Sequence, residues 1–358
     1  MAISLKPLSQ QVMIITGASS GIGLATARAA AKKGAKLVLA SRNEEALRQA
    51  VEQINMDGGE AVYVVADVGQ REDVQRLAEM AIRQFGGFDT WVNNAGVSIY
   101  GKLSEVSEED NRRLFDTNFW GIVSGSLIAA SHLRNRGGAI INLGSELSDV
   151  AIPLQGMYSA SKHAVKGFTD ALRMELEEDE APVSVTLIKP AGINTPYPEH
   201  ARNYTENELT LPPPVYEPEE VANAILHAAV HPERDIFIGS GSKMMSSLNK
   251  YAPSLVDWVN KNFMTKLQVT DEPARHKKGS LHSPGTDGMV HGNHKGHVMK
   301  TSLYTRASMH PVITGAVVAA ASAAALALMN KKRHNRQEGD PNYRTGTYSG
   351  ERYMYKNR

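Results

Sequence analysis

The stretch that decides the fold is Thr16-Gly17-Ala18-Ser19-Ser20-Gly21-Ile22-Gly23, which follows an apolar run and opens a helical pattern. Glycine allows backbone torsions and close approaches that a Cβ atom would block. The start of a helix presents free N–H groups and the positive end of the helix dipole, and both favour a phosphate group. A turn of this kind can also be a plain connection between a strand and a helix. Its place after the first strand favours a nucleotide site.

Strand-like and helical runs alternate outward from this turn as far as residue 240. Several strand-like runs are apolar at successive positions, which is typical of strands covered on both faces. This alternation indicates a parallel sheet with helices on both sides, joined by right-handed crossovers. The sequence therefore predicts an α/β protein with a doubly wound parallel sheet, a Rossmann fold. The predicted strands are Val12–Thr16, Lys36–Ser41, Ala61–Val68, Thr90–Asn93, Ala139–Leu143, Val183–Ile188 and Asp235–Ile238.

The remainder of the chain differs in composition from this alternating part. We expect one domain at 1–255, followed by a helix and a flexible linker at 256–311. The linker prediction rests on residues from 271 onward, where periodicity is lost and Gly, His, Lys, Ser and Thr dominate. An Ala-rich hydrophobic segment follows at 312–329, and a basic polar tail at 330–358.

Composition excludes several classes of function. The chain of 358 residues has no cysteine, so disulfides, thiolate zinc sites and a cysteine nucleophile are excluded. Residues 1–270 carry 25 Lys and Arg against 32 Asp and Glu, whereas residues 271–358 carry 14 against 6. An acidic body argues against nucleic-acid binding as the main function. The N-terminus lacks the apolar stretch of an export signal, so we expect a cytoplasmic protein.

Tyr158 and Lys162 form an informative pair further along the chain. They are four residues apart in a helical pattern, so both side chains lie on one face of the helix. A free phenol titrates near pH ~10, and a nearby ammonium group favours the phenolate and lowers that pKa. A tyrosine with a lowered pKa is a usable general acid or base at neutral pH. The alternative is a Tyr and a Lys on a solvated helix face.

Ser145 and Asn118 add polar groups near the same edge of the predicted sheet. Ser145 follows a strand, so it lies at the carboxyl edge, where parallel sheets bind ligands. Its hydroxyl can donate to a substrate oxygen, or it can be an ordinary turn serine. Asn118 heads an apolar stretch, and a buried Asn needs hydrogen-bond partners. The alternative is an Asn that is satisfied within its own helix.

These motifs together resemble the short-chain dehydrogenase/reductase family over roughly residues 8–240. They occur in the order and at the spacing of that family. The match consists of the glycine-rich turn, Asp67-Val68, Asn93-Asn94-Ala95-Gly96, Asn118, Ser145 and Tyr158-Ser159-Ala160-Ser161-Lys162.

The resemblance implies a role for each member of the catalytic group. Tyr158 would donate a proton to a carbonyl oxygen during reduction, or remove one from an alcohol during oxidation. Ser145 would orient that oxygen, while Lys162 would lower the pKa of Tyr158 and hold the nicotinamide ribose. Asn118 would hold a water that relays protons through the lysine. The cofactor would supply the hydride.

The end of the second strand favours NADP(H) over NAD(H). Enzymes that use NAD carry an acidic residue here, and its carboxylate would repel a 2′-phosphate. Ser41 takes that position and Arg42 follows, and Arg suits a bidentate contact with phosphate. The alternative is an Arg42 that faces solvent. The predicted cofactor-binding residues are Gly17, Ser19, Ser20, Gly21, Ile22, Gly23, Ser41, Arg42, Asp67, Val68, Asn94, Ala95, Gly96, Tyr158, Lys162, Pro190, Gly192, Ile193 and Thr195.

The predicted function is the NADP(H)-dependent interconversion of a carbonyl and an alcohol by hydride transfer. The alternatives are a non-catalytic NADP-binding sensor or scaffold, and an epimerase or dehydratase that retains its cofactor. Candidate substrate lining comes from 97–100, 146–154 and a long insertion at 194–216. The family's substrates are diverse, so the resemblance does not choose among them, but it implies dimers or tetramers. Four side chains of the insertion could bind a polar group, although the sequence favours a loop-holding role: Tyr197, His200, Arg202 and Tyr204.

The hydrophobic segment at 312–329 would be about 27 Å long as a helix, barely the thickness of a bilayer core. Its Ala content makes insertion weak, and basic residues follow it directly. A spanning helix, a helix lying on the cytoplasmic membrane surface and a helix packed on protein all stay open. His291, His294 and His297 have a spacing that metal sites use, but no carboxylate accompanies them, so we expect no metal.

Overall fold

The computed structural model describes residues 3–310, 314–315, 319 and 322. The chain divides into a compact unit, Met1–Met309, and a second unit, His310–Arg358. Apart from the single positions just given, the predicted hydrophobic segment and the basic tail lie outside the described residues. Among the described helices, none is long and apolar enough to cross a bilayer. The membrane-surface interpretation of the hydrophobic segment therefore stays a prediction.

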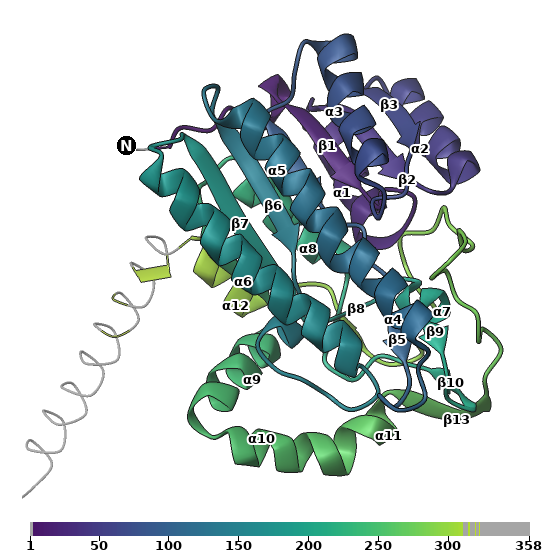
Figure 1. The fold of residues 1–358 in the computed structure, drawn as a ribbon. Coiled ribbons are helices and arrows are strands. Elements are labelled where there is room, and N and C mark those ends of the chain that lie inside the picture. The colour runs from purple at the N-terminus through teal and green to yellow at the C-terminus, as the bar shows by residue number, and fades with distance from the viewer. Residues whose placement is uncertain (1–2, 311–313, 316–318, 320–321, 323–358) are drawn as a thin grey trace, which may run out of the picture. The chain divides into compact units, whose positions relative to one another are not determined.

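The described chain builds a central sheet from β1 (Val12–Thr16), β2 (Lys36–Ser41), β3 (Glu60–Val65), β4 (Thr90–Asn93), β6 (Gly138–Leu143), β7 (Val183–Pro190) and β12 (Asp235–Ile238). The strands are all parallel and lie in the order β12-β7-β6-β4-β1-β2-β3 (Figure 1). The chain moves outward from β1 to β3 and then returns to β4 on the other side of β1. Such a reversal leaves a crevice at the carboxyl ends of the strands.

Helices cover both faces of this sheet, as Figure 1 shows. The helices on each face share a core cluster of buried apolar side chains with the sheet. The first cluster contains residues of α1 (Gly21–Ala31), α2 (Glu44–Met56) and α8 (Pro218–Ala228), and the second contains residues of α3 (Arg71–Phe85), α5 (Gly121–Leu133) and α6 (Gly156–Glu178).

The side chains of β1 explain why both faces are covered. Met13 and Ile15 belong to the first cluster, whereas Val12 and Ile14 belong to the second. Side chains alternate between the two faces of a strand, so a strand that is apolar at every position needs a core on each side. This arrangement confirms the predicted doubly wound α/β fold.

Shorter elements complete the described chain. They are 3-10 helices at Leu8–Gln10 and Glu146–Ser148, π-helical segments at Asp116–Trp120 and Asn260–Met264, helices α4 (Glu108–Phe115), α7 (Tyr197–His200), α9 (Ser240–Tyr251), α10 (Pro253–Val259), α11 (Thr265–Leu267) and α12 (Leu303–Met309), and strands β5 (Ile99–Tyr100), β8 (Gly192–Ile193), β9 (Arg202–Asn203), β10 (Asn207–Leu209), β11 (Val215–Tyr216), β13 (Val269–Pro273) and β14 (Val298–Met299).

The glycine-rich turn joins β1 to α1, as the sequence predicts. Gly17 has a φ of +65°, in the left-handed region that glycine tolerates best. A Cβ atom on Gly23 would lie 2.1 Å from the carbonyl oxygen of Gly17, so glycine lets α1 start close against the turn. Ser20 precedes α1 without capping it through its side chain, and the first turn has no acidic residue. The start of α1 therefore keeps the positive character that the sequence argument requires.

The segment expected to be a flexible linker differs from that expectation. The compact unit does not end at 255 but continues to Met309. β13 pairs with β10, and β14 pairs with β11. Leu281 is fully buried, and Val290 is 7% exposed. Leu281 and Val290 lie in a stretch that is otherwise mostly polar residues, glycine and proline, which is why no periodic pattern revealed them.

Candidate active site

Two adjoining cavities lie at the carboxyl ends of the strands, near the point where the strand order reverses between β1 and β4. We call the first the tyrosine pocket, since its walls include Ser145, Glu146, Tyr158 and Lys162. We call the second the glycine-turn groove, since its wall includes Gly17, Ser19, Ser20, Gly21 and Ile22. The two cavities share the wall residues Ile22, Asn94, Gly96, Thr195 and Tyr197.

Most of the predicted site residues line one of these cavities. Gly23 lines neither, because its role is to let α1 approach the turn. Asn118 also lines neither and is fully buried. The tyrosine pocket is lined by Ser145, Tyr158, Lys162, Pro190, Gly192 and Ile193 among the predicted residues, and the glycine-turn groove by Gly17, Ser19, Ser20, Gly21, Ser41, Arg42, Asp67, Val68 and Ala95, with Ile22, Asn94, Gly96 and Thr195 lining both.

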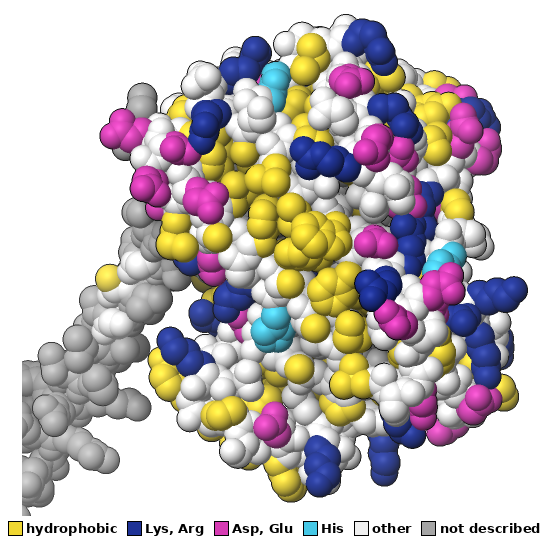
Figure 2. Space-filling model, in the orientation of Figure 1, with side chains coloured by type: hydrophobic (Ala, Val, Ile, Leu, Met, Phe, Trp, Pro, Cys, Tyr) yellow, Lys and Arg dark blue, Asp and Glu magenta, His cyan; other side chains and the backbone are white. Residues whose placement is uncertain are grey.

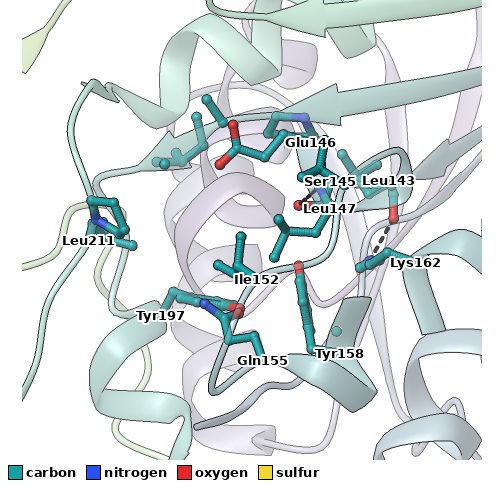
Figure 3. Close-up of a pocket in the computed structure, with 18 of the residues that line it drawn as sticks. Leu143, Ser145, Glu146, Leu147, Ile152, Gln155, Tyr158, Lys162, Tyr197 and Leu211 are labelled. Atoms are coloured by element: carbon teal, nitrogen blue, oxygen red, sulfur yellow. Dashed lines mark hydrogen bonds between the residues drawn. The ribbon is translucent and has the colours of Figure 1, made fainter. Parts of the chain in front are cut away.

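Tyr158 and Lys162 lie on the same face of α6 (Figure 3). The Lys162 amine is 5.6 Å from the centre of the Tyr158 ring. It donates a hydrogen bond of 2.8 Å to the Leu143 carbonyl oxygen at the end of β6. Lys162 is only 4% exposed, and this burial lowers its pKa to about 8. The bond to Leu143 therefore fixes the position of the Lys162 amine in the pocket wall. This amine loses its charge at a lower pH than a solvated lysine does.

The pKa of Tyr158 departs from the sequence expectation. Burial in the pocket has the largest influence and raises the pKa, while hydrogen bonds to Tyr197 and Ser145 lower it and the Glu146 carboxyl raises it. The net pKa of Tyr158 is therefore raised, although the sequence argument expected Lys162 to lower it. That argument did not account for how strongly the surrounding protein disfavours a phenolate. The phenol consequently stays protonated at neutral pH, the form of a proton donor.

Ser145 is held by the turn that follows β6. Its hydroxyl oxygen accepts a hydrogen bond from the Leu147 N–H, at 3.1 Å. The Ser148 hydroxyl accepts one from the Ser145 N–H, also at 3.1 Å, which closes a capping box around the 3-10 helix. Figure 3 shows the Tyr158 hydroxyl pointing toward Ser145. Ser145 is thus an ordinary turn serine, as one of the two interpretations of the sequence expected, and it also lines the tyrosine pocket.

Asn118 connects the strand β4 region to α6. Its side-chain oxygen accepts from the Val97 N–H at 2.8 Å, and its amide group donates to the Val97 carbonyl oxygen at 2.9 Å. The amide group also lies 3.3 Å from the Ser161 hydroxyl, next to Lys162. The hydrogen-bonding groups of the Asn118 side chain are therefore paired with residues outside its own helix. The π-helical segment at Asp116–Trp120 gives it this position at the junction of α4 and α5.

Tyr197 and Gln155 also line the pocket; the sequence analysis named Tyr197 as a residue that holds the insertion or binds a polar group, but it did not single out Gln155. The Tyr197 hydroxyl lies 2.8 Å from the Ser98 hydroxyl and 3.0 Å from the Gln155 side-chain oxygen. Its ring meets the Tyr158 ring edge to face, with centres 6.0 Å apart. Tyr197 therefore holds the insertion in place and also forms a wall against Tyr158. The sequence analysis listed the insertion as candidate substrate lining, but it could not identify the contact with Tyr158, because α7 reaches the pocket only through the tertiary fold.

The rest of the tyrosine pocket is largely apolar. Glu146 is the acidic residue of its wall, and burial raises the pKa of this carboxyl to about 7. Figure 3 shows the Glu146 side chain among apolar neighbours. The apolar wall residues include Leu143, Leu147, Val150, Ile152, Leu211, Met245 and Met264.

The glycine-turn groove is braced by the motif after β4. The Asn94 side chain donates to the carbonyl oxygens of Thr16 and Gly17, at 2.9 and 3.1 Å. The Thr16 hydroxyl oxygen accepts from the backbone N–H groups of Asn94 and Ala95. These bonds lock the turn to the neighbouring strand end, which explains why the two motifs occur together. They also satisfy polar groups that would otherwise be left bare in the groove.

Arg42 lies in the groove wall, with partners that the sequence did not predict. One of its N–H groups donates to the Leu281 carbonyl oxygen at 3.0 Å, and another donates to that of Ser280. Burial has the largest influence on the pKa of this guanidinium and lowers it. Ser280, Gly285 and Asp287 also line the groove. The segment that the sequence analysis expected to be a flexible linker thus forms part of the wall of this cavity.

Within the part of the chain that the structure describes, one group of side chains with metal-binding potential includes a histidine of the C-terminal region. His291 lies beside Glu217 and Glu219, and their ligand atoms are all within 4.8 Å of one another. Two of these three residues are exposed, and none lines either cavity. His294 and His297, which the sequence grouped with His291, do not belong to this cluster.

Comparison with known proteins gives relatives along most of the chain. The family model for short chain dehydrogenases matches residues 11–206. The Uncharacterized oxidoreductase YxnA of Bacillus subtilis (strain 168) is 47% identical over 321 residues, covering 88% of this chain and 90% of that protein. The 11-beta-hydroxysteroid dehydrogenase A of Sesamum indicum is 33% identical over 261 residues, covering 70% of this chain and 74% of that protein.

Solved structures give the same result. An alcohol dehydrogenase from the archaeon Thermococcus sibiricus, complexed with 5-hydroxy-NADP, has a TM-score of 0.57 at 26% identity and covers 64% of this chain and 95% of its own. A short chain dehydrogenase/reductase from Burkholderia phymatum, in complex with NAD, has a TM-score of 0.60 at 28% identity and covers 75% and 99%. With the parallel sheet and the motifs at its carboxyl edge, these matches place the chain in the short-chain dehydrogenase/reductase family of oxidoreductases.

Proposed function

We propose that this protein is an NADP(H)-dependent oxidoreductase that interconverts an apolar carbonyl compound and its alcohol. The observation that carries the proposal is the meeting of Ser145, Tyr158 and Lys162 in a pocket that opens into the glycine-turn groove. A nicotinamide dinucleotide bound in the groove would supply or accept the hydride. The chain's own residues would position the substrate oxygen and move the proton.

The groove fits a dinucleotide in its polar groups. A phosphate is favoured by the start of α1, which has no side-chain cap from Ser20 and no acidic residue in its first turn. Glycine at 17 and 23 brings this helix end close to the turn, where a Cβ atom would fill the space. Asp67 and Val68 line the groove near the end of β3, where the resemblance places the adenine. These features together support dinucleotide binding.

The preference for NADP(H) rests on Arg42. The guanidinium lines the groove at the end of β2, and no acidic residue of β2 stands there to repel a 2′-phosphate. Two of its five N–H groups bond backbone carbonyls, so further donors are left for a phosphate. The titles of the two similar structures name both hydroxy-NADP and NAD, so the likeness by itself does not choose between the cofactors.

Tyr158 is the proposed proton donor for carbonyl reduction. Its raised pKa keeps the phenol protonated at neutral pH, ready to give its proton to a substrate oxygen. The Ser145 hydroxyl, toward which the same phenol points, would hold that oxygen in place. Transfer of the proton leaves a phenolate, which the Lys162 ammonium stabilises from a position 5.6 Å from the ring centre. The same groups run in reverse when an alcohol is oxidised.

The substrate class follows from the pocket wall. Side chains such as Leu147, Ile152 and Met264 favour an apolar body around the reacting carbon. Two relatives, from Sesamum indicum and Pinus massoniana, are named as 11-beta-hydroxysteroid dehydrogenases, which supports an apolar alcohol or ketone. We therefore propose hydrophobic secondary alcohols and the corresponding ketones as substrates.

We further propose that a second copy of this chain covers the face formed by α5 and α6. Figure 2 shows apolar side chains gathered over these helices. Trp120, Leu127 and Met174 are 53%, 43% and 59% exposed. Exposed apolar patches of this kind mark association surfaces. Leu127→Glu should convert a dimer into single chains in sedimentation, and an unchanged sedimenting mass would contradict the assignment.

The proposed activity is tested by following reduced-nicotinamide absorbance with a panel of hydrophobic ketones. The purified full-length protein should consume NADPH and produce an equal amount of alcohol. Conversion of substrate without net consumption would instead indicate an epimerase or dehydratase that retains its cofactor. Binding of NADPH without any conversion across the panel would indicate a sensor or scaffold.

A further inference from the structure

Residues 279–292, which we call the strap, form part of the wall of the glycine-turn groove. Four strap residues line the cavity: Ser280, Pro284, Gly285 and Asp287. The family motifs line the same cavity. Its wall is therefore built from two parts of the chain that lie far apart in the sequence.

Hydrogen bonds tie the strap directly to the glycine-rich turn. The Gly288 N–H donates to the Ser19 carbonyl oxygen, and the Gly21 N–H donates to the Met289 carbonyl oxygen, both at 2.9 Å. The Ser19 hydroxyl lies 3.1 Å from an oxygen of the Asp287 carboxylate. The strap thus contacts the same turn that is expected to hold the phosphates.

A second set of bonds ties the strap to the rim of the groove. The Asn43 amide group donates to the Gly285 carbonyl oxygen at 3.2 Å, beyond the end of β2. The Ser280 N–H donates to the His200 carbonyl oxygen at 2.7 Å, and the His200 ring lies 2.9 Å from the Thr286 carbonyl oxygen. The strap therefore connects the end of β2 with α7, from one rim of the groove to the other.

Apolar anchors hold each end of the strap. Leu281 is fully buried in a cluster with Val97, Ile99 and Leu114. Val290 is 7% exposed and belongs to the first core cluster. Between these anchors, residues 282–284 and 286 are exposed, as are 288 and 289. The middle of the strap therefore has little apolar packing to hold it, and local opening is cheapest in such segments.

The segments before and after the strap are fixed to the body. β13 pairs with β10 on one side. On the other side, the Thr305 hydroxyl of α12 donates to the Phe237 carbonyl oxygen at 3.0 Å. Because both flanks are tied down, the strap can lift and return without the rest of the chain moving.

We propose that the strap closes over a bound nicotinamide dinucleotide and retains it, so that release requires the strap to open. This inference rests on the dinucleotide site of the proposed function. It adds residues of the C-terminal region to that site, in particular Ser280, Gly285 and Asp287. A cavity remains beside the strap, although the Met289 carbonyl oxygen occupies the Gly21 N–H and the Asp287 carboxylate lies at the Ser19 hydroxyl, so a bound phosphate would use the other donors of the turn or take these two from the strap.

The release rate of NADPH tests the proposal without any substrate. Bound NADPH is chased from the full-length protein with excess NADP+, and its fluorescence is followed by stopped flow. Leu281→Ala removes an anchor that does not line the groove, and release should be faster by about tenfold or more. Ser283→Ala, an exposed strap position outside the cavity wall, is the matched control and should release NADPH at the unaltered rate.

Equal release rates in the Leu281→Ala variant and the unaltered protein would overturn the strap proposal alone. Slower release in that variant would also overturn it. If the unaltered protein binds no dinucleotide, both the strap proposal and the proposed function fail. Binding without turnover would leave the strap in place and reject only the redox function.

A thiol-labelling measurement gives a second, independent readout. The chain has no cysteine, so Val290→Cys creates a single thiol at the buried end of the strap. A neutral thiol reagent can reach it only when the strap lifts. Saturating NADPH should slow labelling by about tenfold, because a closed strap shields the thiol. Unchanged or faster labelling would overturn the proposal, and faster labelling would mean that NADPH displaces the strap.

Discussion

The tyrosine pocket and the glycine-turn groove share part of their walls, yet they treat charge in opposite ways. In the groove, charged side chains have partners: Asp67 of the wall pairs with Arg113, and Arg42 lies near Asp287 while bonding backbone carbonyls. In the pocket, Glu146 and Lys162 have no ion-pair partner among the described residues, and burial moves the pKa of each toward neutrality.

This difference separates binding from chemistry. Ion-paired side chains in the groove can recognise a charged cofactor. Unpaired groups in the pocket change protonation state near neutral pH, which proton transfer requires. A substitution in the tyrosine pocket should therefore change turnover and leave cofactor binding nearly unchanged, and a substitution in the groove should do the reverse.

The largest expected effect belongs to the pocket. Tyr158→Phe removes the proton donor, so kcat should fall about 1000-fold while the Kd for NADPH changes by less than about twofold. Steady-state turnover and fluorescence titration measure the two quantities. Tyr63→Phe, a tyrosine that lines neither cavity, is the control and should behave as the unaltered enzyme. A parallel loss of turnover and binding would mean that the two cavities are not separable.

Arg42→Ala is the corresponding test of the groove. Loss of charge-assisted bonds to a 2′-phosphate should weaken NADPH binding by about 30-fold. NADH binding should weaken much less, since only the contacts of Arg42 to the strap are lost for that cofactor. Titration of both dinucleotides measures the ratio. Equal weakening for both would show that Arg42 acts only by holding the strap.

Glu146→Gln tests the buried charge of the pocket through stability. The folded protein raises the pKa of this carboxyl from 4.5 to about 7, because burial disfavours the ionised form. The unfolding free energy is therefore highest while the carboxyl is neutral, and part of it is lost as the pH rises from about 4.5 through about 7. Gln stays neutral, so the variant should gain on the order of 2 kcal/mol in unfolding free energy at about pH 8 and nearly nothing at about pH 4.

Urea unfolding at the two pH values measures this gain. Glu79→Gln, on the exposed face of α3, is the control and should show no pH-dependent difference. A gain of equal size at both pH values would mean that the effect of Glu146 is not electrostatic.

The smallest expected effect comes from the strap side of the groove. The Asp287 carboxylate lies beside Ser19 and near Arg42, where it would repel a 2′-phosphate. Asp287→Asn should therefore improve the ratio of NADPH to NADH affinity by about fivefold, in the direction opposite to Arg42→Ala. Competitive titration of the two dinucleotides measures this ratio. A ratio that falls in the variant would mean that the Asp287 carboxylate does not lie close to the 2′-phosphate.

The walls of the two cavities differ in how well the sequence predicted them, the motif residues being predicted and the strap not. The glycine-rich turn, Asn94 and the Tyr158–Lys162 pair lie within local patterns, and the structure places them at the predicted edge of the sheet. The strap could not be predicted in this way, because Leu281 and Val290 are isolated apolar residues in a polar stretch. Their meaning depends on contacts with strands and helices far away in the sequence.

The sign of the Tyr158 pKa shift was also beyond the sequence. Spacing placed an ammonium group near the phenol, which argues for a lowered pKa. It could not show how completely the pocket buries the ring, and this burial has the largest influence on the pKa. Local spacing predicts which groups meet, whereas burial, which the whole fold determines, decides their charge.

Transfer of a labelled hydride tests the central claim most directly. The protein is incubated with NADPH that carries deuterium at the transferring position of the nicotinamide, together with a hydrophobic ketone, and the alcohol is analysed by mass spectrometry. The account predicts one deuterium on the carbinol carbon for each NADPH oxidised. An alcohol that forms without deuterium, or a converted substrate with no oxidised cofactor, would contradict it.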